Sequence, residues 1–159
     1  FPRLDTGRGL LLKGKGNGDF TSLSQSLSGI DITGDQRGAA FSDYNRDGKV
    51  DLLVGQNNGQ SKLYQNRNAK RGLIVQLKGL KNNPKAIGAK IQLVSMYKKG
   101  PIREVKGGGG YRSQDSAFQV LSLNDPSLNK VRVIWPNSKI SETSFSPDSK
   151  IIKIEEPPK

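Results

Sequence analysis

The residues best able to do chemistry in this sequence lie in one short polar segment, from Asp43 to Asp51. Oxygen-bearing side chains occupy alternate positions at Asp43, Asn45 and Asp47, and another carboxylate follows at Asp51. A hard cation such as Ca²⁺ takes about six to eight oxygen ligands, and alternate residues of a tight turn can direct their side chains inward together. The spacing therefore predicts a Ca²⁺ site, with these ligands: Asp43, Asn45, Asp47, Lys49 (through its backbone carbonyl) and Asp51.

The flanking residues indicate what kind of calcium loop this would be. Gly48 permits a sharp bend, because glycine adopts positive φ without strain. An EF-hand would continue to a bidentate Glu at loop position 12, but Val54 stands there, inside an apolar run. A strand–loop–strand site is therefore expected rather than a helix–loop–helix site. The alternative is a plain turn without metal, since Asp, Asn and Gly are also common turn residues.

The composition excludes most routes to catalysis. The chain has no His and no Cys, which removes Ser-His-Asp triads, imidazole and thiolate metal ligands, and cysteine nucleophiles. Glu104 and Asp115 could serve as a glycosidase carboxylate pair, but nothing in the sequence brings them together. We therefore expect a protein that is not an enzyme.

Two glycine-rich segments could be ligand loops. Residues 107–110 are four consecutive glycines, but no Lys-Ser/Thr pair and no helix follow them, as a phosphate-binding loop requires. Residues 14–19 contain too few oxygens for a second cation loop. An inter-strand loop and a hairpin turn, respectively, are the better predictions.

Positive charge is concentrated in the second part of the chain. The whole sequence carries 26 Lys and Arg against 14 Asp and Glu, a net charge of +12, and residues 67–159 hold 18 of the cations and 7 of the acids. Such a surplus attracts polyanions, so an acidic glycan or a protein partner is expected, and a solvated basic surface is the alternative. Nucleic acid is disfavoured, because no ribonucleoprotein motif or groove-reading helix is present. The candidate partner surface comprises Lys98, Lys99, Arg103, Lys78, Lys81 and Lys85.

The elements that must position these residues are short strands. Apolar runs alternate with Gly, Asn, Asp and Pro, and no window shows a sustained helical period. The expected strands are 9–13, 20–24, 38–42, 51–55, 61–65, 73–78, 89–95, 102–106, 118–123, 130–135, 142–145 and 151–154. This pattern predicts an all-β protein whose second part is a small antiparallel sandwich or barrel. The run Leu52–Val54 predicts a strand buried on both faces.

A composition shift predicts where the chain divides. Residues 1–66 have a net charge of +1 and residues 67–159 a net charge of +11, and a polar run at residues 65–70 separates them. We therefore expect units at 1–66 and 67–155, with a tail at 156–159. No run approaches the roughly 20 apolar residues of a membrane span. Because the chain starts at Phe1 without Met, it is expected to be part of a longer chain or a larger assembly.

Residues 34–55, with the loop Asp43-Tyr44-Asn45-Arg46-Asp47-Gly48-Lys49-Val50-Asp51, resemble an FG-GAP/VCBS repeat. That repeat is the blade unit of integrin-α-like β-propellers and carries Ca²⁺ in its inter-strand loop. Residues 9–12 and 16–20 resemble the closing strands of a preceding blade, and residues 61–66 resemble the strand that follows the calcium loop. The resemblance implies that residues 1–66 are partial propeller blades.

The second part resembles the ASPIC/UnbV domain, which follows such repeats in bacterial surface proteins and in cartilage acidic proteins. The residues that carry this resemblance are 87–91, 103–105, 109–114 and 131–136. Together the two resemblances imply a non-catalytic, calcium-binding, extracytoplasmic module (secreted, periplasmic or cell-surface) for adhesion, ligand binding or scaffolding. The alternatives are a basic accessory subunit of a larger complex and an accessory domain of a secreted hydrolase.

Overall fold

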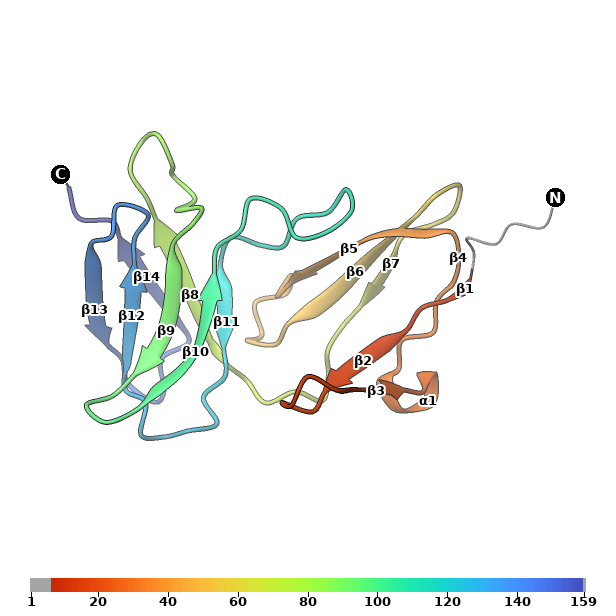
Figure 1. The fold of residues 1–159 in the computed structure, drawn as a ribbon, viewed down its shortest axis with the longest axis horizontal. Coiled ribbons are helices and arrows are strands. Elements are labelled where there is room, and N and C mark those ends of the chain that lie inside the picture. The colour runs from red at the N-terminus through yellow and green to blue at the C-terminus, as the bar shows by residue number, and fades with distance from the viewer. Residues whose placement is uncertain (1–6, 159) are drawn as a thin grey trace.

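The computed structural model describes residues 7–158, and it is almost entirely β-structure, as predicted. Within these residues there are fourteen strands and one four-residue helix, arranged as two groups of strands that lie side by side (Figure 1). Residues 1–6 of the first predicted unit and Lys159 of the predicted tail lie outside the described residues. The predicted boundary at 66/67 falls in the irregular segment between β7 and β8.

The first group contains three small sheets. The pair β1 and β4 and the hairpin β2–β3 precede a three-stranded antiparallel sheet in the order β5-β6-β7. Lys15 N–H donates to the Asp19 carbonyl at 2.9 Å, which closes the hairpin turn expected at residues 14–19. The bounds are β1 Gly7–Arg8, β2 Leu11–Gly14, β3 Phe20–Leu23, α1 Gln25–Ser28, β4 Thr33–Gly34, β5 Gln36–Ser42, β6 Asp51–Gln56 and β7 Lys62–Tyr64.

The β5-β6-β7 sheet corrects the expectation that residues 52–54 are buried on both faces. Val54 is buried, but the next residue toward the N-terminus, Leu53, is 46% exposed. Leu53 pairs with Ala40 and Leu63 and shares their face. The apolar run therefore belongs to a sheet with one largely open face, since successive strand residues point to opposite sides.

The second group is a sandwich of two sheets, and neither sheet closes into a barrel. One has the order β10-β9-β12-β13 and the other β11-β8-β14. The expected antiparallel arrangement is wrong at one pair, because β14 runs parallel to β8, with Ile151 opposite Ile74. The bounds are β8 Leu73–Lys78, β9 Lys90–Val94, β10 Lys99–Glu104, β11 Gln119–Leu121, β12 Lys130–Ile134, β13 Ile140–Ser144 and β14 Ile151–Glu155.

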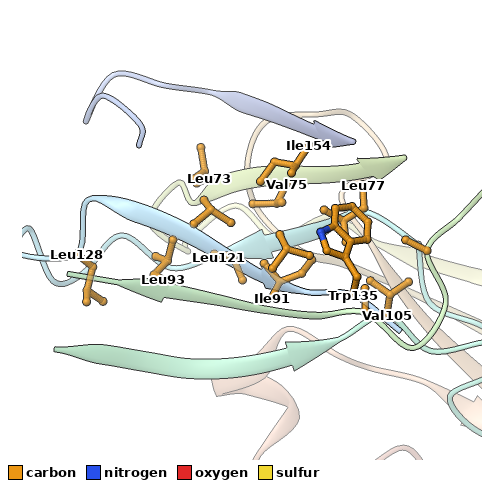
Figure 2. Close-up of a cluster of buried hydrophobic side chains, with 14 residues drawn as sticks. Leu73, Val75, Leu77, Ile91, Leu93, Val105, Leu121, Leu128, Trp135 and Ile154 are labelled. Carbon is orange, nitrogen blue, oxygen red and sulfur yellow. The ribbon is translucent and has the colours of Figure 1, made fainter. Parts of the chain in front are cut away.

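The main core fills the space between these two sheets (Figure 2). Val131, Val133 and Trp135 face inward from β12 and its end, as their alternation predicted, while Lys130 is exposed. Leu73, Val75 and Leu77 enter the core from the opposite sheet. Trp135 is only 2% exposed, and its indole Nε1 donates to Ser141 Oγ at 2.8 Å. This residue is therefore core packing, not a ligand platform.

A loop of the second group is hydrogen-bonded to the free edge of β5. Residues 105–118 extend from β10 toward the first group (Figure 1). Phe41 N–H donates to Asp115 Oδ1 at 2.8 Å, and the Phe41 carbonyl accepts from Ser116 N–H at 3.0 Å. A Cβ on Gly38 would lie 2.9 Å from the Tyr111 carbonyl oxygen, so only glycine allows this approach. The glycine-rich segment thus belongs to a loop that joins the two groups.

Asp115→Ala is expected to loosen this attachment. The substitution removes the acceptor of the Phe41 N–H, which should cost about 0.5–1.5 kcal/mol and speed amide exchange at Phe41. Hydrogen exchange followed by NMR provides the measurement. Asp148→Ala is the matched control, because Asp148 is exposed and its loss changes the net charge equally. Equal acceleration in both variants would contradict the role of Asp115.

Candidate metal centre

The predicted calcium segment forms the loop between β5 and β6. Ser42 ends β5 and pairs with Asp51, which begins β6, so residues 43–50 connect the two strands. Gly48 has φ +84°, and a Cβ there would lie 2.5 Å from Arg71 Cγ and 3.1 Å from the Gly72 carbonyl oxygen. Gly72 N–H in turn donates to the Gly48 carbonyl at 2.8 Å. The bend at Gly48 therefore allows the loop to rest on the start of the second group.

Asp43 is the anchor at the start of the loop. Its side chain is 1% exposed. Oδ1 accepts from Asp47 N–H at 3.0 Å and Oδ2 from Gly48 N–H at 2.8 Å, so the carboxylate folds the loop back over itself. An aspartate that binds backbone N–H groups a few residues ahead is a common way to build a tight loop.

Asp51 is the anchor at the end of the loop, and it is 2% exposed. Oδ2 accepts from Tyr44 N–H at 3.2 Å, which sets this carboxylate next to the residue that follows Asp43. Oδ1 accepts from Asn66 N–H at 2.8 Å. Asp51 therefore ties together the loop, strand β6 and the connector to the second group.

The other three predicted ligands lie at the outer side of the loop. Asp47 Oδ1 accepts from Lys49 N–H at 2.9 Å, and its Oδ2 accepts from Asn45 Nδ2 at 3.1 Å. Asn45 Oδ1 accepts from Asp47 N–H at 3.1 Å. The Lys49 ammonium reaches away to the Arg67 carbonyl at 2.8 Å, so it does not block the loop.

The donor set suits a hard cation. Within residues 7–158, neither Asp43 nor Asp51 forms an ion pair with Lys or Arg, although both are buried. Buried charges are normally paired or bound to a metal, and each carboxylate oxygen has a lone pair beyond the one its hydrogen bond uses. In the described part of the chain, no three or more His, Cys, Asp or Glu side chains are gathered as metal ligands. The buried carboxylates of Asp43 and Asp51 would therefore need further oxygens, from Asn45, Asp47 and the Lys49 carbonyl, to complete a cation site.

Sequence reasoning missed Asn66, which holds this site, and Asp35, which is buried at the opposite end of the β5–β6 pair. Asn66 supplies the N–H that fixes Asp51, and Asn66 Nδ2 donates to the Val50 carbonyl at 3.2 Å. Asp35 is a third buried carboxylate, and it pairs with Arg37 at 2.8 Å and accepts from Asn57 Nδ2 at 2.9 Å. The only sequence signal for either residue was its place beside a strand end, which specifies no partner.

The six cations proposed as a partner surface do not form one patch. Lys98, Lys99 and Arg103 belong to the β9–β10 hairpin, whereas Lys78 ends β8 and Lys81 and Lys85 follow it. The turn between β9 and β10, which carries Lys98, and residues 79–89, which follow β8, lie at opposite ends of the sandwich (Figure 1), whereas Arg103 pairs with Ile91 near the start of β9. Lys78 also pairs with Glu155 at 3.0 Å, and Lys98 pairs with Asp125 at 2.5 Å.

The Lys98–Asp125 pair should give a measurable pH dependence. Hydrogen bonds from Lys98, and then from the hydroxyl and N–H of Ser127, lower the pKa of Asp125 from 3.8 to about 2. A lowered pKa in the folded state stabilises the fold above the unfolded value, and this stabilisation is lost as the pH falls through about 2. Urea unfolding should therefore separate the parent from Asp125→Asn near pH 5 and bring them together near pH 2. A difference that grows on acidification would contradict the pairing.

The two carboxylates that could form a glycosidase pair, Glu104 and Asp115, do line one cavity. Glu104 and Asp115 both line a space of about 340 Å³, together with Arg103 and Lys106. Asp115 is already engaged, because its Oδ1 binds Phe41 N–H. Its place in the structure is therefore explained by the attachment to β5.

Comparisons with known proteins agree with part of the sequence interpretation. The family model described as "ASPIC and UnbV" matches residues 79–159. Cartilage acidic protein 1 of Xenopus tropicalis is 38% identical over 64 residues, which cover 40% of this chain and 10% of that protein. Cartilage acidic protein 1 of Mus musculus is 40% identical, and that of Homo sapiens 38%, each over 60 residues that cover 38% of this chain and 9% of the relative.

The matched regions are short compared with the relatives. The chain spans about a tenth of the length of the curated relatives. The FG-GAP/VCBS resemblance of residues 34–55 stays a prediction. In the described residues, no helix is long and apolar enough to cross a membrane.

Proposed function

The chain belongs to the ASPIC and UnbV family, and from that membership we propose that it is a non-catalytic, extracytoplasmic binding module whose 43–51 loop is stabilised by Ca²⁺. The names of the three relatives place them in cartilage, which supports a location outside the cytoplasm. Adhesion, ligand binding and scaffolding are the roles that suit such a module.

The observation that carries the calcium proposal is the buried pair Asp43 and Asp51. Bound Ca²⁺ would neutralise these two carboxylates, and Asn45, Asp47 and the Lys49 carbonyl are the neighbouring oxygen donors. The chain's own contribution is rigidity, because backbone N–H groups hold both carboxylates at the junction of β5 and β6. We assign the ion a structural role.

Calorimetric titration of chelator-treated protein with CaCl₂ tests this proposal. One site is expected, with a Kd of about 10⁻⁵–10⁻³ M, the range of extracellular calcium modules. Binding should raise the Tm, and MgCl₂ should be weaker because Mg²⁺ demands octahedral geometry. Absence of both heat and thermal shift at millimolar Ca²⁺ would show that the loop is a turn held by hydrogen bonds alone.

The basic charge supports an acidic partner. The surplus of +11 in residues 67–159 favours association with polyanions that weakens with salt. Lys98 and Lys99 lie at the opposite end of β9 from the segment that carries Lys81 and Lys85, which argues against a compact site made from all six cations.

A further inference from the structure

A cavity of about 700 Å³ lies between the first sheet and the loop that grips it. Its walls come from β5, from the end of β6, and from the turn at residues 111–114. This volume is within the usual range of ligand pockets, about 300–1,000 Å³. It is separate from the candidate metal centre, since none of residues 43–51 lines it.

The charge of the lining has one sign. Arg37 and Arg112 both line the cavity, and no Asp or Glu does. Arg37 is steadied by its 2.8 Å pair with the buried Asp35. Arg112 lies over the Tyr111 ring, 5.5 Å from its centroid, and forms no ion pair within residues 7–158. Guanidinium groups bind carboxylates and sulfates through paired N–H donors.

The turn that carries Tyr111 and Arg112 is held in place. Gly110 and Ser113 form an isolated antiparallel bridge, and Gly109 N–H donates to the Ser113 carbonyl at 3.2 Å. Arg112 itself has φ +47°, a conformation that is unfavourable for a side chain of its size. Strained backbone of this kind persists where the surroundings fix it, and functional sites are common locations.

Unused hydrogen-bonding groups also face this region. Ser113 Oγ is buried and has no hydrogen-bond partner in the described part of the chain. Phe41 uses its N–H and C=O outside the β5–β6 ladder. Because these groups alternate along an antiparallel strand, those of Ala39 face the same free edge, beside the cavity.

We propose that this cavity binds an acidic saccharide, a sugar that carries a uronate carboxylate or a sulfate. The two guanidinium groups would hold the anion, the Tyr111 ring would contact the sugar face, and the Gln114 side chain would meet a hydroxyl group. The proposal rests on the binding role given above but needs no Ca²⁺.

An extended acidic peptide fits less well than a sugar. A peptide added to β5 would need a run of free edge groups. The edge is already covered at Phe41 by Ser116, and the ladder is irregular between Gln36 and Gly38. Only a short stretch around Ala39 is therefore open.

Titration of the whole chain with three probes tests the proposal by NMR chemical shifts and calorimetry. The probes are oligogalacturonate (carboxylates only), a heparin-derived oligosaccharide (carboxylates and sulfates) and a neutral oligosaccharide of equal length. At least one acidic probe should shift the amides of residues 37–40 and 111–114, and the neutral probe should bind at least about tenfold more weakly. Binding of oligogalacturonate would identify the carboxylate as the recognised group, and binding of the heparin-derived probe alone would identify the sulfate.

Arg112→Gln should weaken binding of the acidic probe about tenfold or more. Arg112→Lys should weaken it less, since lysine keeps the charge but lacks the paired N–H donors of the guanidinium group. Lys150→Gln makes an equal charge change at an exposed site of the second group that does not line the cavity, and it should change binding less than about twofold. Equal losses in Arg112→Gln and Lys150→Gln, binding of no acidic probe, or displacement by a poly-glutamate peptide would each overturn the inference. A parallel titration of the same chain with CaCl₂ separates the two proposals. If the protein binds the acidic probe but does not respond to Ca²⁺, only the proposed metal centre is contradicted.

Discussion

A variant carrying Asp51→Ala is expected to lose about 2–6 kcal/mol of folding free energy and its response to Ca²⁺ together. Asp51 is buried and accepts the N–H groups of Tyr44 and Asn66. Alanine leaves both donors without a partner, and each such loss costs about 1–3 kcal/mol. In the parent, Ca²⁺ at about a hundredfold excess over Kd should add about 2.7 kcal/mol. Urea unfolding with and without Ca²⁺ measures both effects.

Asparagine at the same position separates the two effects. Asp51→Asn keeps one acceptor oxygen but removes the charge, so it should be less destabilising than alanine and yet abolish the Ca²⁺ response. Asp19→Asn is the matched control, because Asp19 is exposed in the 14–19 hairpin turn and should leave the response intact. An Asp51→Asn protein that still gains stability from Ca²⁺ would exclude Asp51 as a ligand.

The second large effect concerns the core of the sandwich. Trp135→Ala should cost about 3–5 kcal/mol, because it removes a large side chain buried between the two sheets and leaves a cavity. It also leaves Ser141 Oγ without its indole donor. Trp135→Phe should cost less, since the ring volume is partly kept. Far-UV circular dichroism in urea is the suitable measurement, because Trp135 is the only tryptophan and its loss removes the fluorescence signal.

A cost below about 1 kcal/mol for Trp135→Ala would show that the two sheets do not close on this residue. Ile140→Ala provides the comparison in the neighbouring strand. Ile140 is exposed on β13 and should change stability by no more than about 0.5 kcal/mol.

Local pattern predicted the buried strands well. β8 was predicted with its observed bounds, and β12 to within one residue, because their alternating apolar side chains meet one core. The predicted bounds of two edge strands, β10 and β13, lay two to three residues too far toward the C-terminus at their starts. β10 begins at Lys99 and includes Pro101, which an edge strand tolerates because its free side needs no N–H donor. β13 begins at Ile140, because Ile140 pairs with Ile134 of β12 although its side chain is exposed to solvent.

Contacts between distant residues were beyond prediction from local pattern. The loop spacing predicted a turn with Asp43 and Asp51 at its ends. It could not predict that the N–H groups of Asn66 and Gly72 bind this loop, because those hydrogen bonds depend on how the two groups of strands pack. The attachment of Asp115 to Phe41 joins residues 74 positions apart. The cavity between Arg37 and Arg112 arises from that attachment, so no motif in either segment indicated it.

The parallel pairing of β14 with β8 has a consequence for how the chain reaches its fold. Ile151 must find Ile74 across 77 residue positions, and closing so long a loop costs entropy before any contact compensates for it. Until residues 151–155 arrive, one edge of β8 is open to other chains, and such an edge favours aggregation. The sandwich should therefore fold slowly, and its yield during synthesis or export should depend on how quickly this last strand is delivered.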